Sequence, residues 1–167
     1  MLSLGQPFTG YSSFGSNFDS VSSPPIIAPF WDDVDIQRGG TIFYRQDFTS
    51  SVADQVQQEI YTQFPDIGFF YPSLVFVATW DRVAAFSSSF RGRFNTFQAI
   101  IATDGGRTFV RFNYGDIQWG GFRTLIGASA GDGVNFITHP ASLSSSVLLL
   151  DNTTTTYRID GKFHGII

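Results

Sequence analysis

The chain has 167 residues, a length that favours a single folded domain with one sizeable hydrophobic core. Hydrophobic residues make up 43% and charged residues 14%, a composition that excludes a charge-rich disordered chain and a coiled coil. The net charge is −4 and the arginines are scattered singly, which argues against nucleic acid as a partner. No apolar stretch could span a bilayer, which argues against membrane insertion by this domain. Cysteine is absent, which excludes disulfides and thiolate metal sites.

The aromatic share of 17%, with 19 phenylalanines beside 17 glycines, is typical of a β-rich domain. Residues 1–25 are rich in Gly, Ser, Phe and Pro, which predicts an extended arm that wraps around the domain. An apolar run at 26–31 and a β-favouring run at 41–45 flank an acidic segment and the turn pair Gly39-Gly40. We predict that these two runs form a hairpin.

A single amphipathic helix is predicted over residues 51–61. Val52, Val56 and Ile60 recur at four-residue spacing and define one apolar face. The intervening polar residues, Gln57 among them, are expected on the solvent side. The helix is therefore expected to pack against a sheet through its valine and isoleucine side chains.

Strands are expected through most of the remaining chain. Residues 74–80 form a short apolar run, and residues 97–103 and 108–114 flank the turn sequence that begins Asp104-Gly105, which predicts a second hairpin. Further short strands are expected at 123–129, 134–137, 146–150 and 155–159. The fold class is therefore mainly β (α+β): an antiparallel β-sandwich or a curved sheet with one inserted helix.

The densest polar feature is the acidic cluster of Asp32, Asp33 and Asp35, which directly follows the apolar run. One interpretation is structural, with the carboxylates capping turns and pairing with Arg38 or Arg45. The other is chemical, because carboxylates are hard oxygen ligands for Ca²⁺ and can act as a general acid and base. The spacing lacks the glycine and terminal glutamate of an EF-hand loop.

Three further features bear on function. Trp119 and Phe122 form an aromatic pair beside glycines. The pair could be a sugar-stacking platform, whereas a tryptophan in a strand or turn can also be a core side chain. Together with the acidic cluster, the Trp119 platform gives an alternative function as a calcium-assisted carbohydrate-binding module. His139 and His164 are the only histidines, and no nucleophile elbow or zinc-protease motif accompanies them, so no catalytic residues are predicted. Asn152-Thr153-Thr154 is a sequon for N-linked glycosylation, meaningful if the chain is secreted.

Four segments, in order, resemble a known family: IIAPFWDDVD, VATWDRV, NTFQAIIATDGGRTFVRFNYGDIQW and GASAGDGVNF. They are similar to the NIDO domain of nidogen, alpha-tectorin and certain membrane mucins. The resemblance implies a non-enzymatic extracellular module, without cofactors, that contributes to cell–matrix adhesion. Its implied partners are extracellular matrix or cell-surface proteins and neighbouring modules of the same chain. The residues to which the resemblance gives a structural role are Pro29, Phe30, Trp31, Asp33, Asp35, Trp80, Phe97, Gln98, Asp104, Gly105, Phe112, Tyr114 and Trp119.

The resemblance also sets expected boundaries. It extends over most of the chain, so residues 1–160 are expected to form one NIDO-like domain and residues 161–167 a tail toward a following module. The family pattern begins with a strand upstream of Leu2, so the start is expected to be truncated. An extracellular location, in a secreted matrix protein or the ectodomain of a membrane protein, is inferred from the resemblance.

Overall fold

The computed structural model describes residues 1–10, 16–20 and 24–159. Within them the chain forms nine strands in two antiparallel sheets, one α-helix and three short 3₁₀ helices. The strands are β1 (Leu2–Ser3), β2 (Ile26–Trp31), β3 (Thr41–Asp47), β4 (Leu74–Ala84), β5 (Phe94–Thr103), β6 (Thr108–Ile117), β7 (Leu125–Ser129), β8 (Phe136–Thr138) and β9 (Thr154–Arg158). The helices are α1 (Ser50–Gln63), η1 (Phe18–Ser20), η2 (Ser88–Phe90) and η3 (Ser145–Leu149). The predicted tail at 161–167 and His164 lie outside the described residues.

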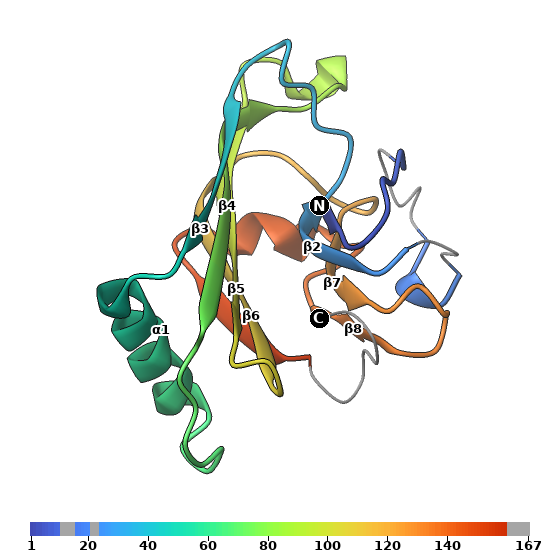
Figure 1. Cartoon of the computed structure of the whole chain (residues 1–167). Coiled ribbons are helices and arrows are strands. Elements are labelled where there is room, and N and C mark those ends of the chain that lie inside the picture. Colours follow the sequence, from blue (N-terminus) through green and yellow to red (C-terminus); the bar gives the residue numbers. More distant parts are fainter. Residues whose placement is uncertain (11–15, 21–23, 160–167) are drawn as a thin grey trace.

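The two sheets face each other as a sandwich (Figure 1). The small sheet has the strand order β1-β2-β7-β8 and the large sheet has the order β3-β4-β5-β6-β9. The main core lies between them, because alternate side chains of each strand point to one face. This arrangement confirms the predicted antiparallel sandwich with one inserted helix.

Aromatic rings fill the centre of this core. The Phe97 ring lies between those of Trp80 and Phe30, with centroids 5.1 and 5.2 Å away. The Phe30 ring meets Trp119 edge-on, also at 5.2 Å. Phe112 is fully buried in the same cluster. The apolar motif residues therefore join the two sheets through ring contacts.

One hydrogen bond also crosses between the sheets. The Tyr114 hydroxyl on β6 donates to the Pro29 carbonyl oxygen on β2 at 2.8 Å. Burial raises the pKa of this phenol well above its usual value. Pro29 can occupy a buried strand because β2 shifts register between Ala28 and Trp31.

Helix α1 covers the outer face of the large sheet at its lower end in Figure 1. Ala53, Val56 and Ile60 are buried, and the latter two pack in one cluster with Phe70 and Phe109. The helix was therefore predicted correctly, within two residues at each end. Gln57 is an exception to the expected polar face, because it is half-buried and its amide donates to the Phe70 carbonyl.

The predicted hairpin between residues 26–31 and 41–45 is wrong. β2 belongs to the small sheet, and β3 pairs with β4 in the large one. The acidic segment between them crosses from one sheet to the other. Its backbone pairs with the end of β4, where the Asp35 N–H donates to the Ala84 carbonyl and the Phe86 N–H donates to the Asp33 carbonyl, both at 2.9 Å.

The second predicted hairpin is confirmed as β5 and β6. The Asp104 carboxylate accepts hydrogen bonds from the amides of Gly106 and Arg107 and forms an ion pair with the Arg107 side chain at 2.8 Å. Gly105 has φ +89°, which a glycine adopts without strain. Of the remaining strands, β7, β8 and β9 were expected, whereas residues 145–149 form η3 instead of a strand.

The described parts of the N-terminal arm extend the small sheet at its edge and pack against Trp31. β1 pairs with β2, and Phe8 and Phe18 pack around Trp31 with ring centroids 5.7 and 6.4 Å away. This placement agrees with an arm that wraps around the domain.

Candidate functional site

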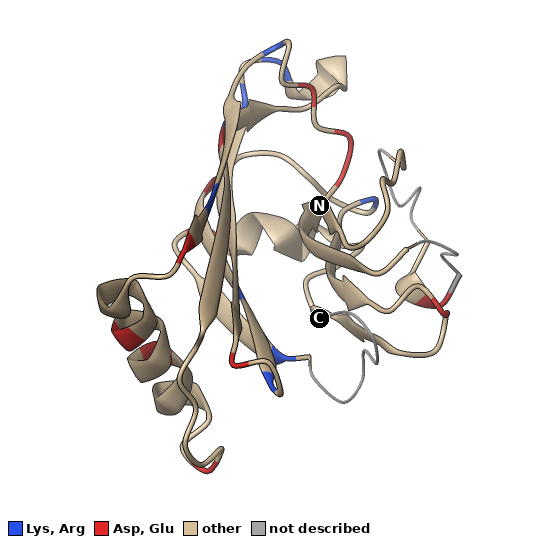
Figure 2. Ribbon diagram, viewed as in Figure 1, with Lys and Arg blue, Asp and Glu red and all other residues tan. Residues whose placement is uncertain are grey.

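A groove of about 1,110 Å³ lies at one end of the sandwich, where three loops meet. The loops are residues 32–38 after β2, residues 85–90 after β4 and residues 119–123 between β6 and β7. The first two rise at the upper end of the molecule in Figure 1. Figure 2 shows that the segment between β2 and β3 carries both acidic and basic residues. The groove is therefore bordered by charges of both signs.

Asp32 ties two of these loops together. One carboxylate oxygen accepts the Asp33 backbone N–H at 2.8 Å, and the other accepts the Thr124 hydroxyl at 2.7 Å. The Thr124 hydroxyl oxygen in turn accepts the Gly121 N–H at 2.9 Å. Asp32 thus holds the floor of the groove in place.

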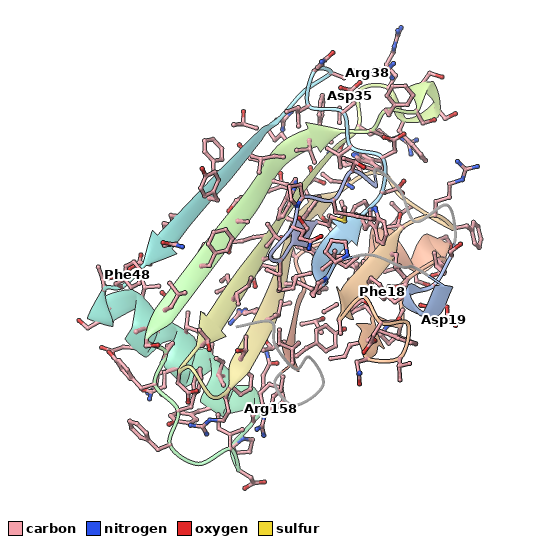
Figure 3. The ribbon with its side chains drawn as sticks, turned by 45° about the vertical axis from the view of Figure 1, so that its right-hand side comes forward. Phe18, Asp19, Asp35, Arg38, Phe48 and Arg158 are labelled. Carbon is pink, nitrogen blue, oxygen red and sulfur yellow. The ribbon has the colours of Figure 1, made fainter. Side chains whose placement is uncertain are left out.

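Asp35 does not line the groove, but it holds Arg38, which does. Its carboxylate accepts the Gln37 N–H at 2.9 Å and pairs with the Arg38 Nε at 3.2 Å. The two side chains lie together at the upper edge of the molecule in Figure 3. The Arg38 guanidinium lies 5.0 Å from the Phe86 ring centroid and donates to the Phe86 carbonyl. This contact links the loop after β2 to the loop after β4.

Asp33 lines the groove together with Asp32, but its side chain takes no part in the hydrogen bonds and the ion pair that hold Asp32 and Asp35. Its pKa is raised above 3.8 by burial first and then by the negative charges of Asp32 and Asp35. A carboxylate with a raised pKa gains most from a cation or a hydrogen-bond donor brought by a ligand. Asp33 is therefore the acidic residue of the cluster best suited to contact a bound molecule.

The geometry supports the structural interpretation of the acidic cluster. Both carboxylate oxygens of Asp32 accept hydrogen bonds from protein groups. The Asp35 carboxylate accepts one backbone N–H and pairs with Arg38. Within residues 1–10, 16–20 and 24–159, no group of three acidic or histidine side chains is arranged to hold a metal ion.

Trp119 does not provide a sugar-stacking platform. Its ring is buried, and its indole N–H donates to the Val83 carbonyl oxygen at 3.0 Å. The ring packs against Phe30, and although Trp119 lines the groove, only 1% of the residue is exposed. The alternative function as a calcium-assisted carbohydrate-binding module thus loses its proposed aromatic surface.

Two other aromatic residues border the groove instead: Phe122, the second ring of the predicted aromatic pair, and Phe86, which sequence analysis did not single out. Phe86 and Phe122 are exposed, the latter at 74%. Both lie on loops, where no periodicity distinguishes an exposed ring from a buried one. The glycines beside Phe122 indicate a tight loop in the sequence, and the structure shows why one of them is needed. Gly120 has φ +136°, and a side chain there would meet the Phe30 ring at 2.7 Å.

Asn95 is another residue that sequence analysis did not single out, and it shapes the groove from within the core. It is fully buried on β5, accepts the N–H groups of Gln118 and Trp119 at 2.8 and 3.0 Å, and donates to the Trp119 carbonyl at 2.9 Å. One side chain therefore fixes the backbone that enters the 119–123 loop.

The half-buried motif residue Gln98 belongs to a polar row on the outer face of the large sheet. Its amide donates to the Thr79 hydroxyl at 2.8 Å and its carbonyl accepts the Asn113 amide at 3.0 Å. Arg111 donates to Asn113 at 2.8 Å and pairs with Glu59 of α1. This row connects the sheet to the helix and lies away from the groove.

The sequon lies on an exposed turn before β9. Asn152 is exposed, with φ +55°, and its backbone N–H donates to the Gly115 carbonyl at 3.0 Å. Thr154, the residue that completes the sequon, is also exposed. We keep the prediction that Asn152 carries a glycan when the chain is secreted.

Glycosylation can be tested without straining the turn. Thr154→Ala should remove the mass of one glycan from protein secreted by eukaryotic cells, as measured by mass spectrometry. Because Asn152 stays in place, its left-handed backbone conformation, which asparagine tolerates, is unchanged. Thr156→Ala is the matched control and should keep the glycan. Unmodified wild-type protein would contradict the prediction.

Comparison with known proteins identifies the family. The model of the nidogen-like domain, NIDO, matches residues 1–164. The chain belongs to this family. Human alpha-tectorin is 29% identical to it over an alignment covering 87% of the chain, human mucin-4 is 33% identical over 77%, and mouse nidogen-2 is 38% identical over 54%.

This NIDO domain spans only a small part of these relatives. The alignments cover 8% of alpha-tectorin, 3% of mucin-4 and 7% of nidogen-2. No solved structure matches the chain. These relatives are extracellular matrix proteins or membrane-protein ectodomains, and this kinship supports an extracellular location. Among the described helices, none has the length and apolarity needed to cross a membrane.

Proposed function

We propose that this NIDO domain is a non-enzymatic interaction module of an extracellular matrix or cell-surface protein, that it contributes to cell–matrix adhesion, and that the groove is its partner-binding surface. The observation that carries the proposal is the combination of exposed aromatic rings and a partly buried carboxyl in one depression. Phe86 and Phe122 offer apolar contact area, and Asp33 lies between their loops. Aromatic side chains contribute most of the energy in many protein interfaces.

The chemistry of the groove favours a protein segment with an apolar side chain next to a basic one. The apolar side chain would cover the exposed rings. The basic side chain would lie against Asp33, whose pKa is raised by burial and by the negative charges of Asp32 and Asp35. Such a pairing fits the net charge of −4 of the whole chain.

The side chains around the groove also support a binding role over a catalytic one. The lining includes Ser87, Ser88 and Ser89 but no histidine. The Ser87 hydroxyl oxygen accepts the Ser89 N–H at the start of η2. His139 lies elsewhere, where its Nδ1 accepts the Ala141 N–H at 3.0 Å. No serine–histidine pair is thus available among the described groove residues, as nucleophilic catalysis of that kind would need.

The proposal can be tested by surface plasmon resonance with the immobilised chain and a panel of purified matrix glycoproteins. Phe122→Ser should weaken binding of any partner by about tenfold or more, because it removes a large exposed contact area. Phe69→Ser is the matched control, since Phe69 is 79% exposed but lies outside the groove. Absence of any binding partner, or equal binding by the two variants, would contradict the proposed surface.

A further inference from the structure

Strand β3 is an unprotected edge of the large sheet. It is the first strand in the order β3-β4-β5-β6-β9, and all its residues except Asp47 are exposed. Ile42, Phe43 and Tyr44 are exposed at 43%, 57% and 77%. Figure 3 shows β3 running along the outside of the sheet, with Phe48 just beyond its end.

The other sheet edges in the described part of the chain are less suited to pairing. β1, β8 and β9 contain only two, three and five residues, and β9 ends at the charged Arg158. Proteins protect their edges with short strands, charges or proline. β3 is seven residues long, lacks proline, and its two charged residues, Arg45 and Asp47, pair with each other at 3.5 Å.

The backbone groups that β3 directs outward follow from the hydrogen bonds at the opposite edge of the sheet. The Tyr114 N–H donates to the Thr153 carbonyl, so even-numbered residues of β6 face the β9 side. In antiparallel sheets this direction alternates along each strand. The odd-numbered residues of β6 therefore bond to β5, the odd-numbered residues of β5 bond to β4, and the odd-numbered residues of β4 bond to odd-numbered residues of β3. This leaves the N–H and C=O groups of Ile42, Tyr44 and Gln46 directed away from the sheet.

We propose that two copies of this chain pair through β3, antiparallel and about a two-fold axis at Tyr44, so that their large sheets join into one. This register pairs the whole strand with its copy. It places Tyr44 opposite Tyr44 of the second copy, and Ile42 opposite Gln46 of the second copy. These are the residues whose backbone groups point outward, so the hydrogen-bonded pairs form without any change in β3.

The side chains on the helix-facing side of the sheet support the same register. Phe43 lies opposite Arg45 of the second copy, and the two-fold axis generates this contact twice. The pair is of the non-hydrogen-bonded type, in which side chains approach most closely. An arginine against a phenylalanine ring gives a favourable cation–π contact, and no like charges lie directly opposite each other in this register. β3 is therefore self-complementary, which an interface between identical copies requires.

The opposite face adds an aromatic contact. The Tyr44 ring stacks on Phe76 of β4 with centroids 6.3 Å apart, so its position is already fixed in the single chain. Pairing would bring two such rings together at the axis. An edge contact of this kind buries a small area, so we expect a weak dimer that forms at high local concentration.

The proposal is tested by sedimentation equilibrium of the 167-residue chain over a range of concentrations. The wild-type chain should dimerise reversibly. Tyr44→Lys and Tyr44→Glu should each raise the dimer dissociation constant by about tenfold or more, because like charges meet at the axis. A mixture of these two variants should dimerise again, since the lysine of one chain then lies opposite the glutamate of the other.

Two controls separate this result from other causes. Phe48→Lys removes a ring that is 72% exposed and adds the same charge outside the paired strand, so it should leave dimerisation unchanged. Phe122→Ser, in the groove, should also leave it unchanged. A wild-type chain that stays monomeric would overturn the proposal. The β3 edge would then be a candidate site for an extended segment of another protein. Equal dimerisation by Tyr44→Lys and Phe48→Lys would overturn it as well.

Discussion

Replacing Val56 with Asp should lower the free energy of unfolding by about 3 kcal/mol or more. Val56 is buried where helix α1 meets the large sheet, in one cluster with Ile60, Phe70 and Phe109. A carboxylate there would lose its hydration without gaining a partner. Arg111 borders the same contact, but it already pairs with Glu59. Chemical denaturation monitored by circular dichroism would measure the change.

The matched control for this variant is Gln58→Asp. Gln58 is exposed on the same helix, so its replacement should change the unfolding free energy by less than about 0.5 kcal/mol. Gln57 cannot serve as a control, because its amide donates to the Phe70 carbonyl and fixes the segment after the helix. Equal stability of Val56→Asp and Gln58→Asp would show that this helix face is not held against the sheet.

Local patterns were sufficient for the elements whose hydrogen-bond partners are close in sequence. The β5–β6 hairpin was predictable because Asp104 and Gly105 supply the turn chemistry and both flanking strands carry β-favouring residues. Helix α1 was predictable because three apolar residues recur at helical spacing. In both cases the information that decides the structure lies within about twenty residues.

Two errors arose where local patterns are ambiguous. Gly39-Gly40 resembles a hairpin turn, but the acidic segment before it pairs with the distant end of β4, so β2 and β3 enter different sheets. Residues 145–149 contain a short apolar run that suits a buried strand or a helix. Only Val147 of this segment is buried, and the chain turns there as η3.

The groove was predicted only in part, for a related reason. The acidic cluster was found, and the fixed positions of Asp32 and Asp35 follow from nearby amides, a hydroxyl and one arginine. Phe122 was noticed only through its place beside a glycine pair, and Phe86 could not be distinguished from the other phenylalanines of a chain that contains 19. Their exposure depends on how three loops, from separate parts of the chain, meet at one end of the sandwich.

Asn95 shows the same limitation most clearly, and it leads to the second large effect that we expect. Replacing Asn95 with Ala should lower the free energy of unfolding by several kcal/mol. Its side chain accepts two backbone N–H groups and donates to one carbonyl, all in the segment that enters the groove. Each buried group left without a partner costs about 1–3 kcal/mol, although such costs do not add strictly.

The control for Asn95→Ala is Asn113→Ala. Asn113 also forms two side-chain hydrogen bonds, but it is only half-buried, so water can replace them and the loss of stability should be clearly smaller. Because the Asn95 bonds hold Gln118 and Trp119 directly before the loop that carries Phe122, Asn95→Ala should also weaken partner binding in the groove under conditions where the chain remains folded. Equal stability of the two variants would mean that the loop backbone finds other partners. If so, the groove would be shaped chiefly by Asp32 and Thr124 on its other side.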